Sequence, residues 1–249
     1  IACDVRDEVQ VQSAIDQIVN KWGRIDILVN NASAISLTSM EHIAMRRYDL
    51  MHSINGRGTF LCSKLALPHL KKSKNAHILN MSPPLNMDAK WFENHTAYTM
   101  SKYNMSMCTL GLAEELKPYH IAVNSLWPRT SIATAAVSNV LGGDYLMNQS
   151  RTVEIVAEAA YHILTLDSSS ECNTGQFFID DQVLNECSAP TAVNLDMYHM
   201  IPGTLNPALD FFVEEPYPGY AREQKVRENG ESEQRQLKPV IAQILHSHL

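Results

Sequence analysis

Tyr98-Thr99-Met100-Ser101-Lys102 is the stretch that decides the interpretation of this chain. The surrounding residues predict a helix over about 96–116. A Tyr and a Lys four positions apart fall on one face of such a helix, about one turn from each other. A free tyrosine titrates near pH 10, and a neighbouring ammonium favours its ionised form. The spacing therefore suits an acid/base tyrosine. The alternatives are a core tyrosine for Tyr98 and a solvated helix face for Lys102.

Outward from this helix, short apolar strands alternate with amphipathic helices. The pattern predicts an α/β fold, a Rossmann-type doubly wound parallel sheet with crossover helices. We expect a long loop over about 127–150 and interpret Asp180-Asp181 as a loop after the last strand. The expected strands are 1–5, 25–29, 76–80, 121–126 and 175–180, and the expected helices are 11–22, 39–49, 50–72, 96–116 and 153–166.

Composition narrows the classes of function. The chain has 249 residues, 45% of them hydrophobic, which is enough for one sizeable core. No apolar run approaches the roughly 20 residues of a membrane span. A net charge of -7 argues against nucleic acid as a partner. The histidines and five cysteines show no spacing typical of a metal site, so we expect no metal and reduced thiols.

Further polar residues surround this helix in a characteristic order. Asn30-Asn31-Ala32-Ser33 follows a predicted strand, Asn55 lies within the next long helix, and Ser82 ends the strand before Tyr98 and Lys102. This series resembles the short-chain dehydrogenase/reductase family. The resemblance implies an enzyme, an oxidoreductase that transfers a hydride between NADP(H) and an alcohol or carbonyl group.

The resemblance also implies roles for these residues. Tyr98 is expected to be the general acid/base, and Lys102 to support it and hold the nicotinamide ribose. Ser82 is expected to hydrogen-bond the substrate oxygen, and Asn55 to anchor a water that links Lys102 to solvent. The family's usual serine lies one position later, at Pro83, so the alternative for Ser82 is a strand-end cap. The alternative for Asn55 is an ordinary helix residue without a catalytic role, and the alternative for Asp4 is a turn residue.

The implied cofactor is NADP. Its adenine end is expected near residues 4–5 and 30–32, and its nicotinamide carboxamide near residues 132–134. Arg129 departs from the family pattern, which usually has glycine after Pro128. The expected cofactor-binding residues are Asp4, Val5, Asn30, Ala32, Tyr98, Lys102, Ile132 and Thr134.

The sequence contains no glycine-rich phosphate motif of the G-x-G-x-x-G type. We therefore expect a domain over residues 1–185 that is truncated at the N-terminus and lacks its first βαβα segment. Residues 186–249 are expected to form an irregular C-terminal arm or linker. The alternative function is a non-catalytic binding or dimerisation partner that lacks the cofactor phosphate site.

Three expectations concern the surroundings of the protein. Apolar residues near Trp91-Phe92 and over 127–141 favour a lipid-like small-molecule substrate. The helix over 96–116 is apolar nearly all round, which favours a homo-oligomer formed through the Tyr98 helix. Ser247-His248-Leu249 resembles a peroxisomal signal, so we expect a peroxisomal protein, with mitochondrion and cytosol as alternatives.

Overall fold

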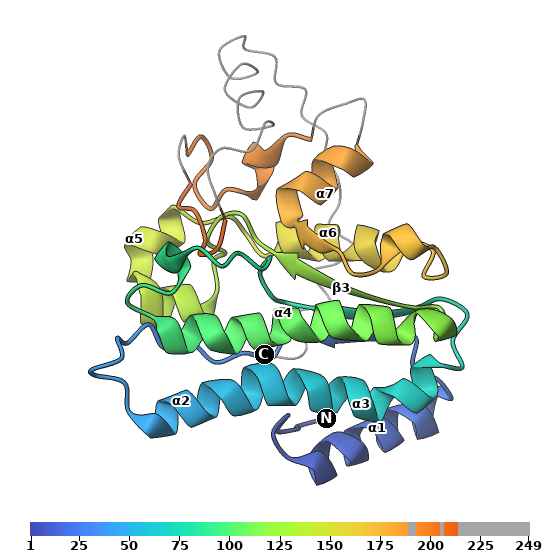
Figure 1. The fold of residues 1–249 in the computed structure, drawn as a ribbon. Helices are drawn as coiled ribbons and strands as arrows, with labels where there is room; N and C mark the ends of the chain where they lie inside the picture. The colour runs from blue at the N-terminus through green and yellow to red at the C-terminus, as the bar shows by residue number, and fades with distance from the viewer. Residues whose placement is uncertain (189–192, 205–206, 214–249) are drawn as a thin grey trace. The chain divides into compact units, whose positions relative to one another are not determined.

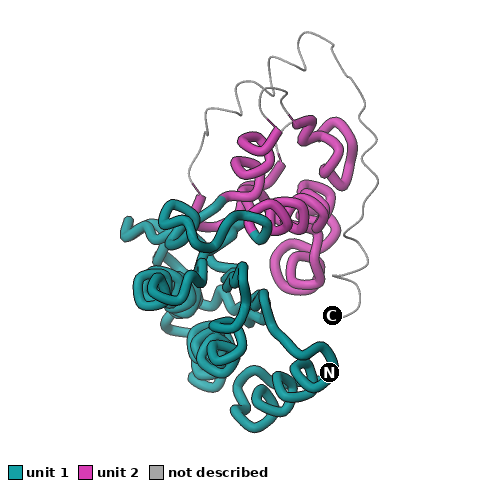
Figure 2. Tube along the Cα trace, turned by 90° about the vertical axis from the view of Figure 1, so that its right-hand side faces the viewer, with its two compact units in different colours: residues 1–127, 164–178 teal, residues 128–163, 179–249 magenta. Residues whose placement is uncertain are grey.

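The computed structural model describes residues 1–188, 193–204 and 207–213. The chain divides into two compact units, which are described separately here (Figure 2). The first unit comprises residues 1–127 and 164–178, and the second comprises 128–163 and the chain from 179 onward. Within the described residues, no helix is long and apolar enough to cross a membrane.

The strands form a four-stranded sheet in the order β1-β2-β3-β4, where β1 is Ile27–Asn30, β2 is Ala76–Asn80, β3 is Ile121–Trp127 and β4 is Phe177–Ile179. The pairs β1–β2 and β2–β3 are parallel, which confirms the expected Rossmann-type parallel sheet. Every residue of β2 and β3 is buried, as is typical of central parallel strands. β1 lies at the edge of this sheet and exposes Ile27 and Val29.

Three helices of the first unit pack side by side (Figure 1): α1 is Glu8–Trp22, α3 is Thr59–Leu70 and α4 is Thr96–Leu116. Asp7 caps α1, because its carboxylate accepts the N–H groups of Val9 and Gln10. Gly23 ends α1 in the left-handed conformation (φ 76°), which glycine adopts readily. These helices and two strands share one apolar cluster, formed by Val11, Ile15, Leu61, Ala66, Leu70, Ala76, Ile78, Ala113, Leu116, Ile121 and Val123.

The segment before α3 differs from the expected pair of helices. α2 (Met45–His52) continues through a π-helical turn, Ser53–Gly58, directly into α3. Gly56 allows α4 to approach this turn, because a Cβ atom there would lie 2.5 Å from the side chain of Asn104. π-helical turns of this kind are frequent at functional sites.

The second unit contains α5 (Gly143–Asn148), most of α6 (Glu154–Leu164) and α7 (Asp180–Cys187). A π-helical turn, Val137–Leu141, and α5 occupy the stretch expected to be a long loop. The expected boundary at residue 185 falls inside α7. Beyond that helix, Leu195, Tyr198 and Phe212 are buried. Apolar packing therefore continues past the expected start of the arm, while residues 214–249 of the arm lie outside the described residues. Short 3₁₀ turns lie at Ala89–Trp91, Lys117–Tyr119 and Glu171–Asn173 in the first unit and at Leu195–Tyr198 in the second.

Candidate active site

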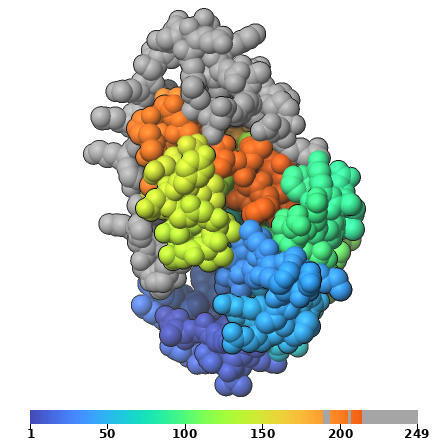
Figure 3. Space-filling model, turned by 90° about the vertical axis from the view of Figure 1, so that its left-hand side faces the viewer, coloured from blue at the N-terminus to red at the C-terminus, as the bar shows by residue number. Residues whose placement is uncertain are grey.

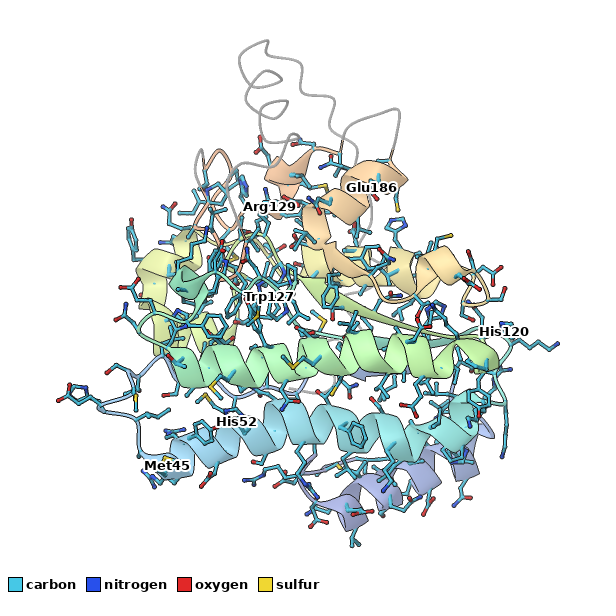
Figure 4. All side chains as sticks on the ribbon, viewed as in Figure 1. Met45, His52, His120, Trp127, Arg129 and Glu186 are labelled. Carbon is cyan, nitrogen blue, oxygen red and sulfur yellow. The ribbon has the colours of Figure 1, made fainter. Side chains whose placement is uncertain are left out.

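Tyr98 and Lys102 lie one turn apart on α4, as predicted, and both side chains are almost completely buried. The Lys102 ammonium donates a hydrogen bond to the carbonyl oxygen of Met81 at 3.0 Å. It also lies 5.1 Å from the ring centre of Trp127, at the end of β3 (Figure 4). A buried ammonium stabilises a nearby negative charge much more than an exposed one does. The position of Lys102 therefore suits it to support ionisation at Tyr98.

Asn55 lies in the π-helical turn and is fully buried. The side-chain oxygen Oδ1 of Asn55 accepts a hydrogen bond from the backbone N–H of Ala34 at 2.8 Å. Its side-chain nitrogen Nδ2 donates to the backbone carbonyl of Ala34 and to the hydroxyl of Ser101, both at 2.9 Å. Asn55 thus joins the loop after β1 to the helix position beside Lys102. These contacts give Asn55 a positioning role, and the expected water link to Lys102 stays a prediction.

Ser82 is fully buried and belongs to a chain of hydrogen bonds between polar side chains. Its hydroxyl lies 2.8 Å from that of Ser125, which lies 2.7 Å from the hydroxyl of Thr109. The chain continues from Thr109 to Asn80 at 2.7 Å and from Asn80 to Asn30 at 2.8 Å. Asn30, expected near the adenine, is thereby connected to Ser82, expected at the substrate. Amide and hydroxyl groups buried in this way must be paired to avoid a large desolvation cost.

Two histidines that the sequence interpretation missed lie near Tyr98. The ring of His95 is 6.5 Å from that of Tyr98, and its Nδ1 atom lies 3.0 Å from the Thr99 hydroxyl. His52, at the end of α2 (Figure 4), interacts with the backbone of Ala97. Burial lowers the pKa of both imidazoles, so both are neutral at pH 7. Their sequence signal was weak because neither belongs to a recognisable motif.

The residues expected at the adenine end lie close together. Val5, Asn30 and Ala32 line one small cavity. Gly58 lines it too, and a Cβ atom there would lie 3.1 Å from the Val5 side chain, so glycine permits this close approach. The Asp4 carboxylate pairs with the Arg6 guanidinium, whose hydrogen bonds lower the pKa of Asp4 to about 2. The Asp4 carboxylate is thus an ionised hydrogen-bond acceptor next to Val5 in the chain.

Ile132 and Thr134, expected at the nicotinamide end, belong to the second unit. Ile132 is buried and forms a β-bridge with Arg151. Thr134 is exposed, and its carbonyl oxygen accepts the N–H of Ser138. The loop that carries them is therefore ordered by backbone hydrogen bonds.

A wider surface cleft of about 470 Å³ borders α2. The residues of α2 are coloured blue in the space-filling view of Figure 3. Its lining includes Arg6, Arg46 and Arg47, and none of the expected catalytic residues lines it. Exposed arginines beside a helix are usually solvated, so we do not place the substrate there. Among residues 1–188, 193–204 and 207–213, no group of His, Cys, Asp or Glu side chains could hold a metal ion.

Comparison with known proteins gives consistent matches. A family model described as "Enoyl-(Acyl carrier protein) reductase" matches residues 1–176. Hydroxysteroid dehydrogenase-like protein 2 of Danio rerio is 54% identical over 212 residues, which cover 85% of this chain and 49% of that protein. The human protein of the same name is 50% identical over 242 residues, which cover 95% of this chain and 55% of that protein. The chain thus spans about half the length of the curated relatives it matches.

Solved structures show the same relationship. A putative dehydrogenase from Xanthomonas campestris is 43% identical, with a TM-score of 0.80 over 86% of this chain and 75% of that chain. A short-chain dehydrogenase from Mycobacterium thermoresistibile is 45% identical, with a TM-score of 0.79 over 88% of this chain and 76% of that chain. The aldohexose dehydrogenase of Thermoplasma acidophilum is 26% identical, with a TM-score of 0.60 over 78% of this chain and 80% of that chain.

Proposed function

The chain belongs to the short-chain dehydrogenase/reductase family of nicotinamide-dependent oxidoreductases, and from this premise we propose that its site interconverts an alcohol and a carbonyl group with NADP(H). The observation that carries the proposal is the buried pair of Tyr98 and Lys102, one turn apart on α4. It lies in the same unit as the expected adenine-end residues, Asp4 and Asn30.

In this proposal Tyr98 moves the proton. Its hydroxyl donates to the substrate oxygen during reduction and accepts the proton back during oxidation. The Lys102 ammonium favours the phenolate that reduction leaves behind. Proton transfer by a positioned side chain typically contributes a factor of about 10² to 10⁴ in rate. Asn55 keeps the Tyr98 helix in register with the loop after β1 through its contacts with Ala34 and Ser101.

We propose Ser82 as a second donor to the substrate oxygen, because the direction of the hydrogen bonds favours it. The amide nitrogen of Asn80 can only donate, and it donates to Thr109. Thr109 can then use its proton on Ser125 at 2.7 Å, a much shorter contact than the 3.5 Å to the Met105 carbonyl. Ser125 can then donate to Ser82, and this direction would leave the Ser82 proton for the substrate oxygen. Successive bonds of this kind strengthen one another.

The nicotinamide of NADP(H) would supply or accept the hydride. Asp4, Val5, Asn30 and Ala32 would hold the adenine end, since three of them line one cavity and the fourth carries a charged acceptor. Lys102 would hold the ribose hydroxyls, and Ile132 and Thr134 the carboxamide. The sequence has no glycine-rich motif for the phosphates, so the proposal assigns no residue of this chain to them.

A lipid-like substrate is proposed from the apolar residues just before the Tyr98 helix. Trp91 and Phe92 are half-buried there, and Phe92 packs edge-on against Tyr103 at 5.5 Å. Met87, in the same loop, has 71% of its surface exposed. Apolar side chains at the start of α4 would favour a hydrophobic substrate over a sugar or a charged acid.

We further propose a homo-oligomer that forms through α3 and the Tyr98 helix. Phe60 on α3 and Met100, Met107 and Leu110 on α4 are all 44% to 57% exposed. Apolar residues clustered on neighbouring helices typically mark an interaction surface.

A peroxisomal location is proposed from Ser247-His248-Leu249 alone, and these residues lie outside the described part of the chain. Imaging a fluorescent protein fused in front of the intact C-terminus, beside a fusion that lacks the last three residues, tests it. Identical distributions of the two fusions would argue against this address.

The proposed reaction is tested first by NADPH binding, measured by fluorescence titration. We would compare this chain with a version that carries, upstream, the glycine-rich segment implied by the family. Binding by either protein supports the cofactor assignment, and binding by neither contradicts it. In the protein that binds, Tyr98→Phe should lower kcat at least 100-fold and leave the Kd for NADPH unchanged. A Tyr98→Phe enzyme with full kcat would refute the role of Tyr98.

A further inference from the structure

Ionisable side chains of the second unit form a buried cluster that the proposed reaction does not use. Each of them is at most 5% exposed, although Arg and Asp are almost never fully buried unless they are paired. They come from three separate stretches of the chain. We call this group the buried ion cluster, and its members are Arg129, Arg151, Asp180 and Asp181.

Asp181 is the anion that pairs with both arginines. Nε of Arg129 lies 2.9 and 2.6 Å from its two carboxylate oxygens, and Nη1 of Arg151 lies 3.5 Å from one of them. Asp180, the preceding residue, instead accepts two backbone N–H groups, those of Arg129 and Asp181. Burial, and then the charge of Asp181, raise the pKa of Asp180 to about 7. Asp181 therefore supplies most of the negative charge that balances the two guanidinium groups.

Both arginines lie on the backbone that orders the loop over residues 129–133. The N–H of Arg151 donates to the carbonyl of Ser131 at 3.0 Å, and the N–H of Ala133 donates to the carbonyl of Arg151 at 2.8 Å. On its other side, the N–H of Ser131 donates to the carbonyl of Ala208 at 2.8 Å. The arginine side chains thus connect this small network of strand-like pairs to Asp181 at the start of α7.

We propose that Asp181 is a positioning residue, which pairs with Arg129 and Arg151 at once and so fixes the backbone that carries Ile132 and Thr134. This inference rests on the proposed function, which assigns those two residues to the nicotinamide end of the cofactor. The glycine that the family usually has at position 129 has no side chain to form such a pair. In this chain the arginine side chain supplies the anchor.

The energetics of buried ion pairs favour a positioning role over a purely stabilising one. Removing charges from water is costly, and well-packed apolar side chains of similar volume often give equal or greater stability. The cluster instead fixes the orientation of the Asp181 carboxylate. Both of its oxygens contact Nε of Arg129, and the guanidinium of Arg151, from another segment, contacts one of them. A shift of the loop would leave a buried charge without its partner.

Amide hydrogen exchange of residues 129–134, measured by mass spectrometry on the full chain, tests the proposal without needing activity. The variants are Asp181→Asn and the triple variant Arg129→Met/Arg151→Met/Asp181→Leu, in which no charged pair remains. Glu114→Gln, which removes an exposed ion pair with Lys117, is the control. We expect exchange at Ser131 and Ala133 to rise at least tenfold in both cluster variants and to stay unchanged in the control.

The triple variant keeps the test decisive if Asp181→Asn fails to fold, because its apolar side chains can pack in place of the charges. A folded triple variant with wild-type exchange in the loop would overturn the proposal, as would faster exchange spread evenly over the chain. NADPH affinity, measured in parallel, should fall at least threefold in the triple variant. If neither the wild-type chain nor the version with the upstream glycine-rich segment binds NADPH, the proposed function fails, while the exchange data still decide the role of Asp181.

Discussion

The stability of this protein should depend on pH through Asp180. Its side chain is fully buried at the start of α7, where burial and the charge of Asp181 raise its pKa from 3.8 to about 7. The charges that act on it are those of Asp181 and Arg151, and the backbone N–H groups of Arg129 and Asp181 donate to it. Between pH 3.8 and 7 the folded protein therefore keeps a proton on Asp180 that the unfolded chain has lost. Folding stability must then fall as the pH rises through this window.

The size of the effect follows from the shift. About three pKa units at about 1.4 kcal/mol each amount to about 4 kcal/mol over the whole window. Between pH 5 and pH 8 the loss is about 2 to 3 kcal/mol, because part of the window lies below pH 5. Asn cannot ionise and resembles the protonated acid, so Asp180→Asn should match the wild type near pH 5 and exceed it at pH 8.

Urea unfolding of both proteins, followed by circular dichroism at pH 5 and pH 8, measures this difference. Buried histidines such as His77, whose pKa is lowered, change stability in the opposite sense, but they are common to both proteins and cancel in the comparison. Asp144→Asn, at an exposed position of the same unit, is the control. A stability difference between Asp180→Asn and the wild type that is the same at both pH values would refute the reasoning, because Asp180 would then not change its protonation state between them.

Three further substitutions test the site and its surroundings. Ser82→Ala should lower the unfolding free energy by about 1 to 2 kcal/mol, because a buried hydrogen bond is lost, and should lower kcat at least tenfold in the protein that binds NADPH. A variant that loses stability but keeps full kcat would show that Ser82 is only a core residue. Asn55→Leu should lower the free energy of unfolding, measured in urea, by about 2 to 4 kcal/mol, because the backbone N–H and carbonyl of Ala34 both lose their partner. A loss below about 0.5 kcal/mol would contradict the positioning role. Met107→Glu should leave the unfolding free energy within about 0.5 kcal/mol but shift the mass measured by light scattering toward the monomer; an unchanged mass would exclude Met107 from the oligomer interface.

Some of the site was predictable because local patterns encode it. The strands expected at 25–29, 76–80 and 121–126 are found at 27–30, 76–80 and 121–127. Tyr98 and Lys102 occupy one helix because their spacing matches the helical period. Other features were not predictable in this way. At the π-helical turn, Gly56 lies close to Asn104, a residue far away in the chain, and no local pattern predicts that approach.

The sequence by itself determined the family, the parallel sheet and the helix that presents Tyr98 and Lys102, since each follows from periodicity or from an ordered series of motifs. Only the tertiary structure decided which buried polar groups meet. Asp180 and Asp181, expected in a loop, form the start of α7, and Asp181 pairs with Arg129. The hydroxyl of Ser82 forms a hydrogen bond with that of Ser125. These partners are separated by 52 and 43 residues. Local patterns carry no information on such pairs, because the cost of burying a charge or hydroxyl selects its partner only once the chain is folded.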